Sequence, residues 1–180
     1  RLVVIIFIGL WSSEMNYAQN GNYENLKPLY QNKNYQECYQ SSAKANDPYG
    51  LIFNALSFYR MPDKQEPKKE KNDPLLYTLE ILRKANEKIE NPNIKDQSFF
   101  KGELQEIQQT MFEKARKWYN LGLQQRAEEY FDAMHQTFDD SNPIFENQYA
   151  FNDDHFLKTL RSNIIREEEN KEVYSKQIEK

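Results

Sequence analysis

Apolar residues recur at spacings of three and four along most of the chain, and no stretch alternates between apolar and polar residues for more than a few positions. Such spacing predicts helices rather than strands. In the clearest stretch, from about Gln97 to Leu121, the successive gaps are four, three, four, four and three. Its members are Phe100, Leu104, Ile107, Met111, Ala115 and Trp118. One face of a long helix is therefore expected to be buried, and the whole pattern predicts an all-α fold.

A second apolar stripe follows this helix, and Gly122 lies between the two. The stripe consists of Leu123, Ala127, Tyr130, Phe131, Met134 and Phe138. Because glycine adopts positive φ without steric cost, Gly122 is predicted to end the first helix and to turn the chain into the second. The two stripes together predict an antiparallel helix hairpin.

An upstream pair of helices is predicted with clearly marked ends. Its apolar residues are Leu51, Ala55, Phe58 and Tyr59 in the first helix and Leu75, Leu79, Leu82, Ala85 and Ile89 in the second. Asp47 and Asp73 each precede a proline, which places a capping carboxylate before a proline at the first helical position. Pro92 is predicted to close the second helix, because the residue before a proline is disfavoured in the α region.

A further, shorter pair is predicted at residues 23–31 and 34–44, with Pro28 delaying the start of its first helix to about Lys27. The connection 61–73 exceeds the usual length of about two to eight residues between paired helices. We interpret it as a surface insertion, and its lysines leave open a contact with an acidic partner. These lysines are Lys68, Lys69 and Lys71.

Residues 151–180 are predicted to form a C-terminal helix that starts near Asp153 and is mostly charged in its second half. Its apolar residues are Phe156, Leu157, Leu160, Ile164 and Ile165, and Glu167, Glu168 and Glu169 follow them. Because the charged half has little to bury, this helix is either solvated or a linker to a further domain.

The chain begins with Arg1 and a run of ten uncharged residues, Leu2 to Trp11. This run is too short to span a bilayer, but it has the length of the apolar core of a secretory signal. We interpret residues 1–18 as a signal peptide that lacks its start, with an apolar helix or strand packed on the protein as the alternative. The ending Tyr17-Ala18-Gln19, before a region rich in Asn, Lys and Tyr, resembles exported proteins of Bacteroidota. Export to the periplasm or the cell exterior is therefore expected.

The amino-acid composition narrows the classes of molecule that the chain is expected to bind. The chain has 180 residues, a formal net charge of -4, 29% charged residues and 14% aromatic residues. Aromatic residues in this proportion predict a folded chain rather than a disordered one. The balanced charges disfavour nucleic-acid binding, which needs a dominant basic stripe, and no stable membrane insertion is expected after signal removal. A single Cys excludes an internal disulfide bond.

The third hairpin carries the residue types of a known helical repeat at the corresponding spacings. They are Ala115, Trp118, Gly122, Ala127, Phe131 and Met134, the last in place of the usual alanine. Looser matches are Ala55, Phe58, Thr78, Leu82 and Ala85 in the second hairpin and Leu29, Cys38, Ser42, Ala45 and Pro48 in the first. Residues 22–143 thus resemble a tetratricopeptide-repeat protein with insertions, because the spacing departs from the usual period of about 34 residues.

The resemblance implies one helical domain over residues 20–150, in which antiparallel hairpins stack as an α-α superhelix. Stacked repeats of this kind expose a concave groove that holds a peptide or a protein segment. The groove positions implied for this chain are Tyr30, Tyr59, Arg60, Arg116, Tyr119 and Asn120. Tyrosine offers a large contact area at low entropic cost, and arginine presents a planar fork to carboxylates. Alternatively, these tyrosines bury their rings between repeats.

Motifs for catalysis or metal binding are absent from the sequence. His135 and His155 stand twenty residues apart, and there is no HExxH, CxxC or glycine-rich phosphate loop. Cys38 is interpreted as a buried thiol at a helix contact. We therefore expect an exported, non-catalytic scaffold that binds a protein or peptide without a cofactor or metal. Two alternatives remain open: an accessory module of a larger secreted or envelope enzyme whose catalytic domain lies outside this chain, and a helical bundle without repeats.

Overall fold

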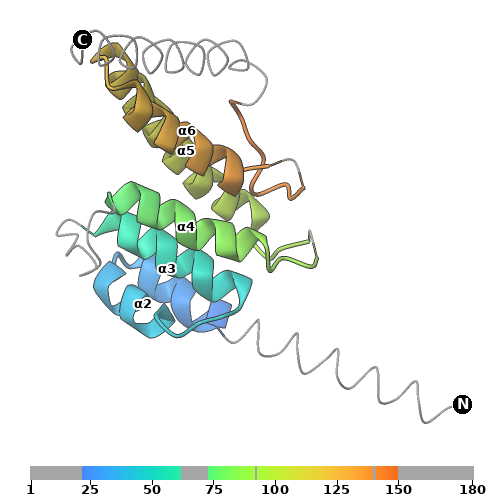
Figure 1. Cartoon of the computed structure of the whole chain (residues 1–180). Coiled ribbons are helices and arrows are strands. Elements are labelled where there is room, and N and C mark those ends of the chain that lie inside the picture. The colour runs from blue at the N-terminus through green and yellow to red at the C-terminus, as the bar shows by residue number, and fades with distance from the viewer. Residues whose placement is uncertain (1–21, 62–72, 92, 140, 150–180) are drawn as a thin grey trace, which may run out of the picture. The chain divides into compact units, whose positions relative to one another are not determined.

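A computed structural model describes residues 22–61, 73–91, 93–139 and 141–149, and all regular structure in these ranges is helical (Figure 1). The predicted all-α class is therefore confirmed. Residues 22–31 are helical, and the later helices are α2 (Tyr35–Ser42), α3 (Pro48–Arg60), α4 (Pro74–Asn86), α5 (Gln97–Asn120) and α6 (Gln124–Thr137). The signal peptide predicted at 1–18, nearly all of the insertion predicted at 61–73 and the C-terminal helix predicted at 151–180 lie outside the described residues.

The chain divides into two compact units, Arg1–Pro92 and Asn93–Lys180. We call them the N-terminal unit and the C-terminal unit and describe each by itself. The boundary falls inside the single repeat domain expected over residues 20–150, between the second and third predicted hairpins. Helices that follow one another in the chain pack together within each unit: α2 with α3, α3 with α4, and α5 with α6.

In the N-terminal unit, α3 packs against α2 and α4 and carries most of the core (Figure 1). Every residue from Ile52 to Phe58 is buried. A helix with neighbours on two sides needs an apolar surface wider than a single stripe, which explains the nearly continuous apolar sequence. The Phe58 ring lies between two tyrosines, 5.6 Å from Tyr39 of α2 and 4.9 Å from Tyr77 of α4, measured between ring centroids.

Both predicted caps of the N-terminal unit are confirmed. The Asp47 carboxylate accepts a hydrogen bond from the Gly50 backbone N–H at 3.0 Å, and the Asp73 carboxylate accepts one from the Leu75 N–H at 2.9 Å. The glycine in the first turn of α3 is needed for space, because a Cβ at Gly50 would lie 2.2 Å from the Cβ of Ala45. Each cap satisfies a backbone donor that the start of a helix leaves without an intrahelical partner.

Two predicted helix ends were wrong. The first helix is already formed at residue 22 and continues through Pro28, because proline removes only one backbone donor and the next turn still closes, with Asn32 N–H donating to Pro28 O at 3.0 Å. Helix α4 ends at Asn86, well before Pro92. Its last turn tightens through hydrogen bonds between residues three apart, including Ile89 N–H to Asn86 O at 3.1 Å.

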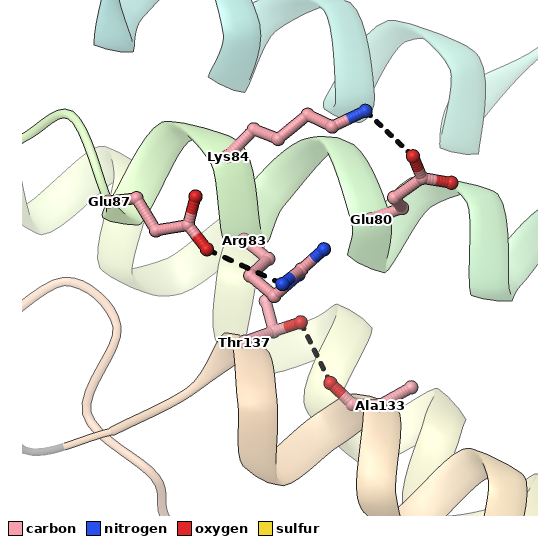
Figure 2. A network of polar contacts seen from close by, with 6 residues as sticks. All are labelled: Glu80, Arg83, Lys84, Glu87, Ala133 and Thr137. Carbon is pink, nitrogen blue, oxygen red and sulfur yellow. Dashed lines mark hydrogen bonds and ion pairs between the residues drawn. The ribbon is translucent and has the colours of Figure 1, made fainter.

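Hydrogen bonds and ion pairs within single helices are drawn in Figure 2. On α4, Lys84 pairs with Glu80 at 2.7 Å and Arg83 pairs with Glu87 at 3.4 Å. On α6, the buried Thr137 hydroxyl donates to the Ala133 carbonyl oxygen at 2.8 Å. The α4 pairs are exposed and contribute only a few tenths of a kcal/mol each, about 0.2 to 0.5, so the fold rests on its buried contacts.

In the C-terminal unit, α5 and α6 form the predicted hairpin, and Gly122 ends α5 with a φ of +76° as expected. The turn is a Schellman motif, in which Gly122 N–H donates to Tyr119 O and Leu123 N–H donates to Trp118 O, both at 2.9 Å. The predicted stripe of α5 is buried from Phe100 to Ala115. Leu123 was wrongly assigned to the buried stripe, because the turn places it outside the helix contact.

Candidate functional site

The six predicted groove residues fall into two groups of three. Tyr30, Tyr59 and Arg60 belong to the N-terminal unit, and the others, Arg116, Tyr119 and Asn120, lie in the last two turns of α5 in the C-terminal unit. A single groove that runs through both units therefore stays a prediction.

Arg60 brings the N-terminal group together. Its Nε donates a hydrogen bond to the Tyr30 hydroxyl at 3.3 Å, and its guanidinium carbon lies 5.4 Å from the centroid of the Tyr59 ring. Tyr30 itself is only 4% exposed, and its ring centroid lies 5.8 Å from that of Phe53 in the core. The expected groove role of Tyr30 is therefore corrected: its ring is a core element that helps to position Arg60. Tyr59 and Arg60 are half-buried and remain accessible.

The C-terminal group lies beside a shallow pocket of about 350 Å³. The pocket is lined by Glu113, Arg116, Lys117, Asn120 and Leu121. Two of the predicted residues, Arg116 and Asn120, are therefore in its wall, and both are exposed. Glu113, the one carboxylate among these lining residues, accepts a hydrogen bond from the Gln109 side chain at 3.0 Å. Two cations beside one carboxylate make the pocket suitable for an anionic group.

Two leucines of the turn are exposed, which sequence reasoning missed, and one of them, Leu121, is part of the pocket wall. Leu121 is 61% exposed and Leu123 is 49% exposed, on either side of Gly122 in the turn. Close by, the Arg126 guanidinium carbon lies 5.7 Å from the centroid of the Trp118 ring. Adjacent apolar side chains in water can mark a contact site. The available signal was the sequence Leu-Gly-Leu itself, because a glycine that ends a helix turns its neighbours away from the core.

A non-helical segment lies against α5 and is held there through its backbone. We call residues 141–149 the strap. The side-chain amide of Gln108 donates to the Glu146 carbonyl oxygen at 2.9 Å and accepts from the Gln148 backbone N–H at 3.1 Å. Gln108 is only 1% exposed. An amide side chain carries both a donor and an acceptor, so it pairs with a peptide backbone much as a neighbouring strand would.

Side chains of the strap add anchors on both sides of this pairing. Phe145 and Ile144 are fully buried, and the Phe145 ring centroid lies 6.0 Å from that of Phe138. Glu146 forms an ion pair with Lys101 at 2.6 Å. Tyr149 stacks on Phe112 with ring centroids 4.4 Å apart and an angle of 9° between the ring planes. The strap therefore has a defined register on α5.

The contacts of the strap follow one line along α5. The residues of this line are Lys101, Gln108, Phe112 and Tyr119, at intervals of seven, four and seven, which return to one helix face. The first three contact the strap, and Phe112 contacts its last described residue, Tyr149. Tyr119, which was predicted as a groove residue, is the next position on the same line. Sequence reasoning missed the strap because residues 141–149 have no helical or strand periodicity.

The Cys38 thiol and the His135 ring each contact another part of the fold. Cys38 is fully buried, its Sγ lies 3.6 Å from the Leu26 carbonyl oxygen, and burial raises the pKa of the thiol. This confirms the interpretation of Cys38 as a buried thiol at a helix contact. The His135 Nδ1 lies 3.4 Å from the Asn147 side-chain nitrogen of the strap. In the four described ranges, no three or more His, Cys, Asp or Glu side chains are grouped so that they could hold a metal ion.

Across these same residues, none of the helices combines the length and the apolar character needed to cross a membrane. Comparisons of the chain with protein-family models, with curated proteins and with solved structures found no match. The class that the structure defines is an all-helical protein in which consecutive helices pack together within two compact units.

Proposed function

We propose that the chain is an exported, tetratricopeptide-like scaffold that binds a segment of a protein partner along the exposed face of α5. The observation that carries this proposal is the strap, which α5 holds through the buried amide of Gln108. Because that pairing uses backbone groups of the bound segment, it depends little on the segment's sequence. A helix face that holds one non-helical segment in this way is suited to hold a second segment beside it.

The next turns of α5 supply the groups that such a second segment needs. Tyr119 continues the line of strap contacts, and the pocket that contains Arg116 and Asn120 opens nearby. Tyrosine and arginine dominate contact surfaces because they combine a large area with directional hydrogen bonding. The bound segment is expected to place a carboxylate near Arg116 and an apolar side chain on Leu121.

The packing of the repeat-like positions agrees with the proposed class. The small residues of the three second helices, Cys38, Thr78 and Ala127, are all fully buried, and so are the aromatic residues Phe58 and Phe131. The tetratricopeptide resemblance requires small side chains at these positions, because they let the paired helices approach closely. Ordinary helical bundles use similar residues at their helix contacts. This agreement therefore supports the proposal but is not the observation on which it rests.

Peptide selection tests the proposed function. A displayed library of short random peptides is selected for binding to the purified chain, and each enriched peptide is then measured against single variants. We expect enrichment of peptides with carboxylates next to apolar residues. Their affinity should fall about tenfold or more in Arg116→Ala and Tyr119→Ala, since each loss of 1.4 kcal/mol is a factor of ten.

Glu87→Ala serves as the control, because this exposed residue directly after α4 lies in the N-terminal unit. Circular dichroism should show unchanged helicity in all three variants. A library without enriched peptides, or enriched peptides that bind the α5 variants as well as the wild type, would refute the proposal. Export is tested separately by fusing residues 1–18, completed with a start codon, to a reporter that is active only outside the cytoplasm.

A further inference from the structure

The turn between α5 and α6 presents two apolar side chains to solvent. Leu121 and Leu123 are the exposed large hydrophobic residues of the described part of the chain. They stand at the end of the helix hairpin, one on each side of Gly122. We call these three residues the tip. The shallow pocket nearby includes Leu121 but not Leu123. The two leucines therefore project from a turn and are not enclosed together in this pocket.

The sequence around the tip is basic in a chain that is acidic overall. Residues 114–126 contain no carboxylate and four cations, which are Lys114, Arg116, Lys117 and Arg126, whereas the whole chain has a formal net charge of -4. The last three of these cations are exposed, and none of the three pairs with a carboxylate in the part of the chain that the structure describes. The tip therefore suits an occupant that is both apolar and anionic.

Cations stand about one helical turn behind the leucines on both helices. Lys117 precedes Leu121 by four residues on α5, and Arg126 follows Leu123 by three residues on α6. At 1.5 Å per residue, their backbone positions lie about 4 to 6 Å behind the tip. A lipid surface has the same order of chemistry, because apolar side chains that enter it pass the charged headgroups and are buried by about 5 to 10 Å.

We propose that the tip docks on an anionic lipid surface. Leu121 and Leu123 enter the boundary between the headgroups and the acyl chains, and Lys117 and Arg126 face the lipid phosphates. Binding is weak and reversible, since each cation near an anionic surface raises the affinity by only about fivefold. This contact adds a second kind of partner to the proposed function, because it holds the scaffold at a membrane while the strap-bearing face of α5 binds a protein segment.

Two other occupants fit the tip less well. A second copy of the chain that met the tip with its own tip would bring the same cations together, and like charges repel each other. A peptide gains most of its affinity from side chains that fill pockets in its partner, and the pocket here encloses only one of the two leucines. A lipid surface needs no pocket, because its fluid headgroup region accepts projecting apolar side chains.

The test places an environment-sensitive fluorophore on the tip of the full chain. Leu123→Cys supplies the thiol, while the native Cys38 is fully buried and stays unlabelled. Vesicles made of equal parts of phosphatidylglycerol and phosphatidylcholine should shift the emission to the blue, and vesicles of phosphatidylcholine alone should shift it much less. The matched control carries the fluorophore at Gln136→Cys, an exposed position near the other end of α6, and should show no shift. Because the signal comes from one labelled position, contact made by another part of the chain does not produce it.

A double substitution tests the contribution of the cations. In the chain labelled at residue 123, Lys117→Gln with Arg126→Gln should raise the lipid concentration needed for a half-maximal shift about tenfold or more. Lys44→Gln with Lys88→Gln removes two exposed cations from the N-terminal unit and should leave this concentration unchanged. Circular dichroism should show the same helicity in every variant. Added salt should weaken binding of the labelled chain, because it screens exposed charges.

Equal shifts at residues 123 and 136, no shift with either kind of vesicle, or equal shifts with anionic and neutral vesicles would overturn the proposal. Equal effects of the two double substitutions would also overturn it, because charge near the tip would then make no difference. If a selected peptide shifts the emission at residue 123 and anionic vesicles do not, the occupant is a protein segment and lipid docking is wrong. Peptide selection uses no lipid, so its outcome tests the proposed function separately.

Discussion

The two units bury their apolar residues in different ways. In the N-terminal unit, α3 has a helix on two sides and buries a nearly continuous run of residues. In the C-terminal unit, the α5–α6 hairpin carries the strap, whose Phe145 and Ile144 complete the core. A single hairpin has too little apolar surface to bury by itself, so an irregular segment supplies the missing layer. The need for this layer brings a peptide backbone onto α5.

The N-terminal ends of the helices also differ between the two units. Helices α3 and α4 begin with an aspartate whose side chain caps the first turn, whereas α5 and α6 begin without a side-chain cap hydrogen bond. The N-terminal unit thus caps two of its helices, α3 and α4, through a neighbouring side chain, whereas its α2 begins without such a cap. In the C-terminal unit, the Gln108 side chain of α5 makes two hydrogen bonds to the backbone of the strap. Substitutions can therefore separate the two kinds of stabilisation.

The largest effect is expected from Phe145→Ala. Removing this fully buried ring should destabilise the C-terminal unit by about 3 to 5 kcal/mol, as truncation of buried aromatic residues usually does. Amide hydrogen exchange measured by mass spectrometry should show faster exchange in α5 and α6 and unchanged exchange in α3 and α4. A uniform change over both units would argue against their independence.

Gln108→Ala should have the next largest effect. It leaves the Glu146 carbonyl oxygen and the Gln148 N–H without their partner, which costs about 1 to 3 kcal/mol when such groups are buried. Urea denaturation of the C-terminal unit reports the loss. Gln109→Ala, one residue away on the exposed surface, is the control and should change stability by less than about 0.5 kcal/mol. Equal effects would show that the strap pairing contributes nothing.

In the N-terminal unit, Asp73→Ala should cost about 0.5 to 2 kcal/mol, because it removes the cap that accepts from Leu75 N–H. Glu80→Ala removes only an exposed ion pair with Lys84 and should cost at most about 0.5 kcal/mol. Thermal unfolding followed by circular dichroism compares the two. A larger loss from Glu80→Ala would contradict the local account of this unit.

Gly102→Ala is expected to stabilise α5. The glycine is exposed inside the helix, and a Cβ there would meet no other atom within 4 Å. Alanine in a helix interior is favoured over glycine by about 0.5 to 1 kcal/mol. The midpoint of urea denaturation of the C-terminal unit should rise accordingly, and a decrease would indicate a contact at this position.

The smallest effect is a dependence on alkaline pH in the N-terminal unit. Burial raises the pKa of Tyr39 to about 12, and its hydrogen bond with Tyr77 adds to the shift. The folded state therefore holds this proton more tightly than the unfolded chain, whose tyrosines titrate near pH 10. The stability that this residue contributes is present below about pH 10 and is lost as the pH rises towards 12. Denaturation of Tyr39→Phe should show a weaker decline in this range.

Much of the fold could be predicted from local physical rules. The spacing of apolar residues placed α5 and α6, the aspartate-proline pairs placed the starts of α3 and α4, and Gly122 placed the turn. The strap could not be predicted, because its position depends on Gln108, a polar residue that sequence patterns assign to the surface. Likewise, the burial of Tyr30 depends on tertiary contacts with α2 and α3, and these contacts remove it from the predicted groove.

The central claim is that the face of α5 beyond the strap binds a protein segment. It is tested most directly by replacing Tyr119 with a photo-crosslinking amino acid and irradiating the chain with a selected peptide. Mass spectrometry should find the peptide attached at position 119, and a crosslinker in place of the exposed Glu106 should capture little of it. Equal capture at both positions, or capture at neither, would contradict the account.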